Sequence, residues 1–339
     1  MATDPERILL AHGGGGRLSN QLIHEHILPQ FKNDTLSELT DAAHLRLPSS
    51  DICFTTDSYV VKPLFFRGGD IGKLAVCGTV NDLAVSGARP LALSLALIIE
   101  EGFEFELLDK ILHSASEAAQ QNHVTIVTGD TKTVEHGSAD GIFINTAGIG
   151  IRLPNVNLGL DKVEVGDNIL LSGTIGEHGM TIVSQREGIG FESPLESDCA
   201  GLAELTIALF ESVPGIRFMR DPTRGGLAAT LNEIVESSRR SVEIDERAIR
   251  IRPAVLAAAD MLGFDVLNAA NEGKFVAVVS LDAAQKCLKI CREHPLGREA
   301  DVIGEIVQTR DVPLVEMKTK IGGRRIVQMP YGRELPRIC

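Results

Sequence analysis

The sequence comprises 339 residues, of which 44% are hydrophobic and only 4% aromatic, and its formal net charge is −13. A chain of this length favours two domains, and the negative charge disfavours nucleic acid or an anionic membrane as the main partner. The first residues lead straight into a short apolar run rather than a signal peptide, and the longest apolar stretch, 91–99, is too short to cross a bilayer. We therefore expect a cytoplasmic α/β protein.

Hydrophobic periodicity predicts a first domain over residues 1–155. Strands are expected at 8–12, 52–58, 91–100, 124–132 and 141–151, and helices at 18–28, 71–86 and 104–121. Four consecutive glycines, Gly13, Gly14, Gly15 and Gly16, join the first strand to the first helix. Such a run is typical of a loop that cradles phosphate at a helix N-terminus. It lacks the Lys-Ser/Thr pair of a P-loop, however, and is equally compatible with a flexible flap.

Three aspartates stand at the ends or on the faces of these predicted elements. Asp57 and Asp130 each end a predicted strand, and Asp82 follows Asn81 within an apolar helix. An ionised carboxylate on an apolar face is costly unless it is paired or binds a metal, and Mg²⁺ in nucleotide sites bridges a few carboxylates to phosphates. We therefore favour a metal-nucleotide site over the alternative, in which each aspartate faces solvent.

A polar link around 152–167 leads into a second predicted domain, 156–315. Its expected strands lie at 168–173, 274–281 and 301–307, and its expected helices follow 174–180 or lie at 201–210, 228–238 and 282–293. Asp221, Thr223 and Arg224 precede one of these helices, where either an anion or an ordinary N-cap would be favoured. Glu272 stands just before a strand, as a general base of raised pKa or as a turn residue.

Residues 316–339 are predicted to form a flexible, basic tail, because lysines and arginines outnumber acidic residues there and glycines and prolines interrupt it. The sequence ends at Cys339, with Arg337 nearby to favour a reactive thiolate. The other five cysteines have settings typical of buried small hydrophobes. They are Cys53, Cys77, Cys199, Cys287 and Cys291.

Five motifs together resemble the HypE family of hydrogenase maturation factors, which belongs to the superfamily of aminoimidazole ribonucleotide synthetase, selenophosphate synthetase and thiamine monophosphate kinase. The motifs are residues 57–61, 80–88, 129–132, 220–226 and the final Pro-Arg-Ile-Cys, 336–339. The last of these is highly specific, because other members of the superfamily lack such an arm.

The resemblance implies a two-domain, PurM-like α/β fold whose N-terminal domains pair into a dimeric β-barrel, with ATP·Mg²⁺ bound near that interface. It also implies that a HypF-type carbamoyltransferase loads a carbamoyl group onto Cys339. This protein would then dehydrate that group to a thiocyanate and pass the cyano group to a HypC–HypD complex, for the iron of [NiFe] hydrogenase.

The resemblance also implies roles for individual residues. Asp57, Asp82 and Asp130 would hold Mg²⁺, Lys132 would stabilise the transferring phosphoryl group, and Glu272 would act as base. The remaining nucleotide-binding residues would be Gly13 to Gly16, Asn81, Asp221, Thr223 and Arg224. Two alternatives stay open: a phosphotransferase of the same superfamily that acts on a free small molecule, and a non-enzymatic thiol carrier that uses Cys339.

Overall fold

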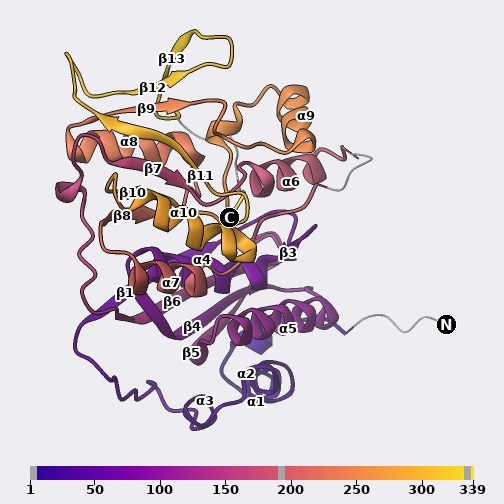
Figure 1. The fold of residues 1–339 in the computed structure, drawn as a ribbon. Helices are drawn as coiled ribbons and strands as arrows, with labels where there is room; N and C mark the ends of the chain where they lie inside the picture. Colours follow the sequence, from indigo (N-terminus) through magenta and orange to yellow (C-terminus); the bar gives the residue numbers. More distant parts are fainter. Residues whose placement is uncertain (1–5, 190–194, 332–336) are drawn as a thin grey trace.

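The structure, a computed structural model, describes residues 6–189, 195–331 and 337–339. Gly332 and Pro336 of the predicted tail lie outside these residues. The described chain forms two α/β parts, one built on a four-stranded sheet and the other on a seven-stranded sheet. Figure 1 shows the N-terminal part, in indigo and magenta, below the C-terminal part, in orange and yellow. The predicted α/β class is confirmed.

The N-terminal sheet has the strand order β1-β6-β4-β5. Its strands are β1 (Ile52–Tyr59), β6 (Ile142–Arg152), β4 (Ala88–Glu100) and β5 (Thr125–Val134). Before it come the 3₁₀ helix η1 (Leu10–Gly13), the helices α1 (Arg17–Leu22), α2 (Leu28–Phe31) and α3 (Asp34–Ser37), and a π-helical turn at Ile23–Ile27. A small hairpin of β2 (Phe65–Phe66) and β3 (Gly69–Asp70) follows β1.

Helix α4 (Ile71–Val85) occupies the centre of the molecule. It begins at Asp70, whose side chain accepts hydrogen bonds from the backbone N–H groups of Gly72 and Lys73. It packs against the N-terminal sheet, against α5 (Phe105–Gln121) and against α7 (Ala203–Ser212) of the C-terminal part. Nearly all of its side chains are therefore buried, as its apolar sequence predicts.

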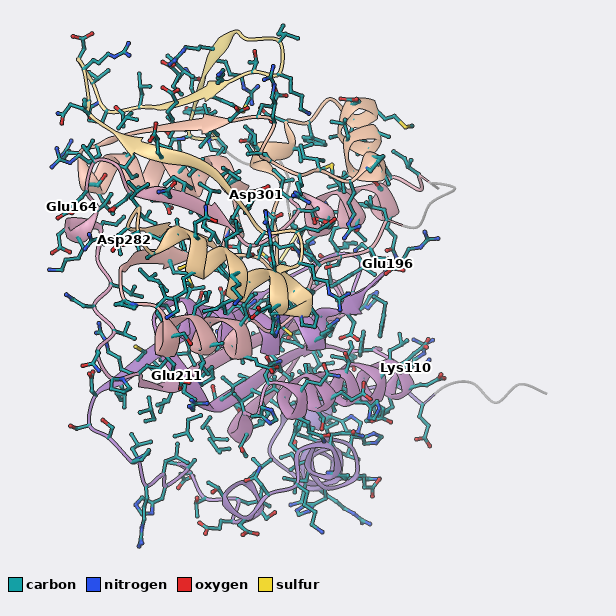
Figure 2. The ribbon with its side chains drawn as sticks, viewed as in Figure 1. Lys110, Glu164, Glu196, Glu211, Asp282 and Asp301 are labelled. Carbon is teal, nitrogen blue, oxygen red and sulfur yellow. The ribbon has the colours of Figure 1, made fainter. Side chains whose placement is uncertain are left out.

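The C-terminal sheet has the strand order β13-β12-β9-β11-β7-β10-β8. Its strands are β7 (Asn168–Leu171), β8 (Ile216–Arg220), β9 (Ser241–Asp245), β10 (Val276–Val279), β11 (Asp301–Val307), β12 (Val315–Lys318) and β13 (Arg324–Val327). Helices α6 (Glu177–Arg186), α7, α8 (Gly226–Ser238), α9 (Pro253–Leu262) and α10 (Ala284–Glu293) accompany it. Charged side chains such as Lys110, Glu211 and Asp282 point outward from the two parts (Figure 2).

Two predictions about the ends of the chain are wrong. The expected strand at 8–12 is mostly the 3₁₀ helix η1, with only an isolated bridge between Arg7 and Glu104. The predicted flexible tail from 316 onward begins instead inside the C-terminal sheet, because β12 pairs with β9 and β13 pairs with β12. Charges on these strands form ion pairs, as between Arg324 and Glu243, so the basic residues there are partly neutralised.

One face of the N-terminal sheet packs on α4, and the other face carries exposed apolar side chains. Phe54 is 67% exposed, Ile98 43% and Ile52 41%. The strand register places Asp130 and Lys132 of β5 on this same open face. Within the described ranges, no helix combines the length and the apolar character needed to cross a membrane.

Candidate active site

The end of the chain docks between the two parts of the molecule, where Figure 1 marks the C-terminus. The Val60 N–H donates to the Cys339 carbonyl (3.3 Å), and the Lys62 N–H donates to the Arg337 carbonyl (3.2 Å). The Ile338 side chain is buried, with 4% exposed, and Cys339 is partly buried. Both join the core cluster of the N-terminal part.

Acidic side chains surround the docked Cys339 thiol. Burial, followed by the charge of Glu272, raises the pKa of this thiol to about 12, and Asp57 and Asp221 contribute in the same direction. Arg224 opposes them but does not prevail. The expectation of a reactive thiolate is therefore wrong for the docked position: Arg337 instead pairs with Asp140 and lies over the Phe143 ring.

Glu272 is the most deeply buried member of an acidic cluster that also contains Asp57, Asp82 and Asp221, and it is 2% exposed. Burial, and then the charges of Asp221 and Asp198, raise its pKa well above the usual range. Among the residues that the structure describes, its Oε1 atom has no hydrogen-bond partner. A buried acceptor without a donor is costly, so Glu272 is set to receive a hydrogen bond from a bound group.

Asp82 and Asp221 are further members of this acidic cluster. The Thr55 hydroxyl donates to Asp82 (2.7 Å), but burial outweighs this bond and raises the Asp82 pKa, with the Asp57 charge adding to the shift. Burial, and then the charge of Asp82, raise the pKa of Asp221 to about 7. The charge of Asp57 thus opposes ionisation of Asp82, and the charge of Asp82 opposes ionisation of Asp221, which is the situation that a bound cation relieves.

Asn81, on α4 of the N-terminal part, forms hydrogen bonds with the C-terminal part next to Glu272. Its amide donates to the Ala200 carbonyl (3.0 Å) and the Glu272 carbonyl (3.1 Å), and its oxygen accepts from Leu202 (2.8 Å). All of its polar atoms are engaged within the protein, and the residue is 1% exposed. In this arrangement Asn81 positions the Glu272 loop, whereas the sequence predicts a nucleotide contact.

A second group of predicted residues gathers elsewhere, at the edge strand β5. A cavity of about 260 Å³ is lined by Gly13, Gly15, Asp130 and Lys132, among others. The Lys132 ammonium pairs with Asp130 (2.8 Å), and this contact lowers the Asp130 pKa. Gly13 lies so close to β5 that a Cβ atom would stand 2.5 Å from the Thr133 nitrogen. The glycine loop and Lys132 are thus neighbours, as expected of a phosphate site.

The predicted three-carboxylate magnesium site does not form within one chain. The register through Thr146 and Leu95 aligns Asp57 with Gly129, the neighbour of Asp130. Three strand spacings separate the two aspartates, which is roughly 14 Å, whereas Mg²⁺ holds its ligands at about 2 Å. Over the described ranges, no group of three His, Cys, Asp or Glu side chains is arranged to hold a metal.

The turn before α8 contains Asp221, Thr223 and Arg224. The Thr223 carbonyl accepts from Gly226, and the Asn271 amide donates to the Pro222 carbonyl (3.0 Å). Because Asn271 directly precedes Glu272 in the sequence, this hydrogen bond ties the turn to the segment that carries Glu272. The positive charge of Arg224 works to lower the pKa of both Asp82 and Cys339. Arg224 therefore lies within reach of an anion bound at the acidic cluster.

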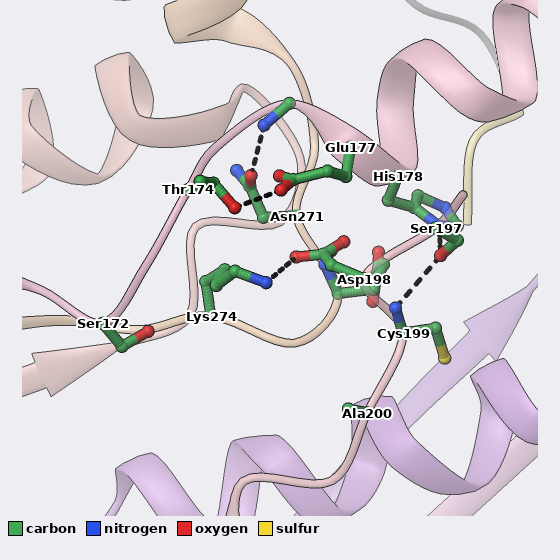
Figure 3. Close-up of polar contacts among 12 residues, drawn as sticks. Ser172, Thr174, Glu177, His178, Ser197, Asp198, Cys199, Ala200, Asn271 and Lys274 are labelled. Carbon is green, nitrogen blue, oxygen red and sulfur yellow. Dashed lines mark hydrogen bonds and ion pairs between the residues drawn. The ribbon is translucent and has the colours of Figure 1, made fainter. Parts of the chain in front are cut away.

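Sequence reasoning missed the polar contacts of Ser197, Asp198 and Lys274, which Figure 3 shows. Asp198 accepts a hydrogen bond from the Glu272 N–H (3.1 Å) and pairs with Lys274 (3.2 Å). Although burial opposes it, this ammonium holds the Asp198 pKa below its usual value. His178 contacts Ser197 and the docked tail. These residues carried no local pattern, because each has its partner far along the chain.

Comparisons with known proteins agree with this architecture. Residues 39–152 match the AIR synthase related protein N-terminal domain, and residues 164–315 match its C-terminal domain. The chain is 48% identical over 330 residues to the carbamoyl dehydratase HypE of Azotobacter vinelandii, which covers 97% of this chain and 96% of the relative.

Solved structures extend the comparison. The crystal structure of the hydrogenase maturation protein HypE in complex with ATP has a TM-score of 0.94 and 43% identity, and covers 98% of this chain and 99% of that chain. The structure of a HypE–HypF complex matches with a TM-score of 0.80 and 46% identity, over 93% of this chain and 100% of that chain.

Proposed function

This chain belongs to the HypE family of carbamoyl dehydratases, and we propose that it removes water from a carbamoyl group carried on Cys339. The product is a thiocyanate, whose cyano group becomes a ligand of the iron in [NiFe] hydrogenase. One observation carries the proposal: the charge that most affects the docked Cys339 thiol is that of Glu272, a buried carboxyl group with an unpartnered oxygen.

A carbamoyl group on Cys339 would supply the hydrogen-bond donor that Glu272 lacks. Its NH₂ group provides two N–H donors, and the unpartnered Glu272 oxygen is an acceptor in the same place. Dehydration must remove both of these protons from nitrogen, together with the oxygen. A carboxylate of raised pKa is a strong proton acceptor once it is ionised, so Glu272 is assigned as the base.

The amide oxygen is a poor leaving group, so the reaction needs activation. When bound, ATP supplies the phosphoryl group that turns this oxygen into a leaving group, and Mg²⁺ offsets the charge of the phosphates. A family structure with ATP bound supports the nucleotide. Asp57 and Asp82 would hold the cation, because the charge of Asp57 opposes ionisation of Asp82 and Mg²⁺ in nucleotide sites needs only one or two carboxylates besides the phosphates.

The glycine loop, Asp130 and Lys132 are assigned to the nucleotide as well, across an interface with a second copy of the chain. Asp130 and Lys132 lie on the open face of the N-terminal sheet, together with the exposed Phe54 and Ile98. A second copy that covered this apolar face would also border Lys132. The homodimer therefore accounts both for the exposed apolar face and for the separation of Asp130 from Asp57.

The carbamoyl donor is proposed to be a HypF-type carbamoyltransferase, supported by the related HypE–HypF complex. A HypC–HypD complex is proposed as the acceptor of the cyano group. Transfer of the carbamoyl group to Cys339 and of the cyano group from it both require Cys339 to leave its docked position, since the docked thiol is partly buried and holds its proton.

The decisive experiment is the mass of the C-terminal peptide. The protein is incubated with a HypF-type carbamoyltransferase and carbamoyl phosphate, and ATP·Mg²⁺ is then supplied. The peptide containing Cys339 should gain one carbamoyl group and then lose one water. A free small molecule that became phosphorylated while this peptide stayed unmodified would establish the phosphotransferase instead. Unmodified peptide without any ATP turnover would favour the thiol carrier.

A further inference from the structure

We propose that His178 is a positioning residue: its ring holds the Ile338 carbonyl and thereby keeps Cys339 in register with Glu272. The inference rests on the proposed function only for its consequence in turnover. The hydrogen bond between His178 and Ile338, which we call the latch, is a property of the docked tail and can be tested without any partner protein or nucleotide.

His178 lies at the start of α6 and is fully buried. Its Nε2 atom stands 2.8 Å from the Ile338 carbonyl oxygen, and its Nδ1 atom stands 2.8 Å from the Ser197 hydroxyl. A carbonyl oxygen only accepts, so the contact with Ile338 requires the proton on Nε2. Nδ1 must then accept from Ser197.

Ser197 is arranged for that role. Its hydroxyl oxygen accepts a hydrogen bond from the Cys199 N–H (3.1 Å), which leaves the hydroxyl proton for His178 (Figure 3). The Ser197 backbone N–H donates to the Arg67 carbonyl, so the residue is fixed. The tautomer of His178 that donates to the Ile338 carbonyl thus finds a hydroxyl donor for its Nδ1 atom in Ser197.

The surroundings of the ring favour its neutral form. Burial lowers the His178 pKa and outweighs both the hydrogen bond with Ile338 and the charge of Asp198. The ring also packs edge-on against Phe66, at 5.4 Å between centroids. His178 is therefore a rigid neutral donor.

Helix α6 offers a second donor to the tail at its other end. The Arg186 guanidinium donates to the Arg337 carbonyl (2.8 Å), and His178 donates to the next carbonyl along the chain. These two residues are eight positions apart, which places them on one face of a helix. The tail thus lies along α6, with main-chain contacts from Val60 and Lys62 on its other side.

The loop that fixes His178 also fixes the proposed base. Ser197 orients the ring, and the adjacent Asp198 accepts from the Glu272 N–H. Two consecutive residues, Ser197 and Asp198, thus contact both the ring that holds the tail and the backbone of Glu272. Loss of the His178 contact leaves the buried Ile338 carbonyl without a partner and favours withdrawal of the tail.

The latch is tested by the alkylation rate of Cys339, measured by mass spectrometry of its own peptide in the full chain, without nucleotide. His178→Phe keeps a ring against Phe66 but removes the donor, and His178→Gln places an amide N–H near the position of Nε2. Alkylation should be about tenfold faster in His178→Phe and close to the original rate in His178→Gln. Ser197→Ala, which frees the tautomer without removing the ring, should give an intermediate rate.

An unchanged rate in His178→Phe, with circular dichroism showing an intact fold, would overturn the proposal. Equal acceleration in His178→Gln would also overturn it, because volume rather than the donor would then matter. If His178→Phe does not fold, the Ser197→Ala rate decides in the same way. In turnover, His178→Phe should slow water loss from carbamoylated Cys339 without weakening ATP binding, and His178→Gln should restore it. A parent protein that is never carbamoylated would refute the proposed function and leave the labelling result standing.

Discussion

Glu272 acts electrostatically on the docked Cys339 thiol, although 66 residues separate the two in the sequence. After burial, Glu272 is the group that raises the pKa of the Cys339 thiol most strongly. The docked thiol therefore keeps its proton, which protects it from alkylation and oxidation. Its modification must take place while the tail is withdrawn.

Replacement of the thiol tests the central assignment. Cys339→Ala should abolish carbamoylation completely, because no other described group at the end of the chain offers a sulfur. ATP affinity should stay unchanged, since the proposed ligands Asp57, Asp82 and Lys132 belong to other elements. Mass spectrometry of the C-terminal peptide and isothermal titration with ATP·Mg²⁺ measure the two properties. Persistent carbamoylation of the variant would remove Cys339 from the mechanism.

The assignment of the base predicts a loss of turnover without a loss of binding. Glu272→Gln keeps the size of the side chain and its buried position but cannot take a proton. Dehydration of carbamoylated Cys339 should slow by at least about a hundredfold, the usual effect of losing a general base. Single-turnover mass spectrometry measures the rate, with ATP affinity as the control. A rate near that of the parent protein would leave Glu272 a structural role only.

The acidic cluster predicts that Asp82 is needed for Mg²⁺-dependent binding of ATP. Asp82→Asn should weaken Mg²⁺-dependent ATP binding by roughly tenfold or more, because it removes a charged ligand. Asp130→Asn is the matched comparison, since Asp130 pairs with Lys132 and is assigned to the nucleotide rather than to the cation, so its effect on ATP binding should be the same with and without Mg²⁺. Titrations with and without Mg²⁺ separate the two. Equal affinities in Asp82→Asn and the parent protein would exclude Asp82 from the metal site.

The raised pKa of Cys339 predicts that docking weakens at high pH. The docked thiol has a pKa of about 12 against an ordinary value of 9.0, so the docked state binds its proton more tightly than the free state. Docking is therefore strongest below pH 9.0 and loses up to about tenfold per pH unit between the two values.

The measurement is the alkylation rate of Cys339 against pH, beside that of a free peptide with the same final residues. The peptide rate should level off once its thiol is ionised, near pH 9.0. The rate in the protein should keep rising above that pH, because the tail is released as the pH increases. Two curves that level off at the same pH would show that the docked thiol is not protected in this way.

The exposed face of the N-terminal sheet predicts a homodimer that one substitution disrupts. Phe54→Asp places a carboxylate on the apolar face and should shift the protein to a monomer, because burial of an unpaired charge is costly. Ile321→Asp is the control, since Ile321 is 96% exposed in the β12–β13 hairpin. Sedimentation velocity measures the mass. An unchanged dimer in Phe54→Asp would place the interface elsewhere.

Much of this architecture is predictable from local patterns. The helix at 104–121 and the strands at 52–58 and 301–307 have periodicities that match α5, β1 and β11 within two residues. Matches to both AIR synthase related domains confirm the two-domain, PurM-like fold. The domain boundaries at 155 and 315 stay predictions. Strands β8 and β9 escaped prediction because they are short, and their pairing partners lie far along the chain.

The sequence by itself determined the longer helices and strands, since the spacing of apolar residues is a local property, and its terminal motif identified the family. Only the tertiary structure decided which polar residues meet. Asp57 and Asp130 look alike in sequence, yet strand order and register put them at opposite edges of one sheet. His178 meets Ile338 across 160 residues, and this contact depends on how α6, the β1 edge and the tail pack together. The hydrogen-bond partners of the docked tail and of Glu272 come from several elements, so no single stretch of sequence encodes the site.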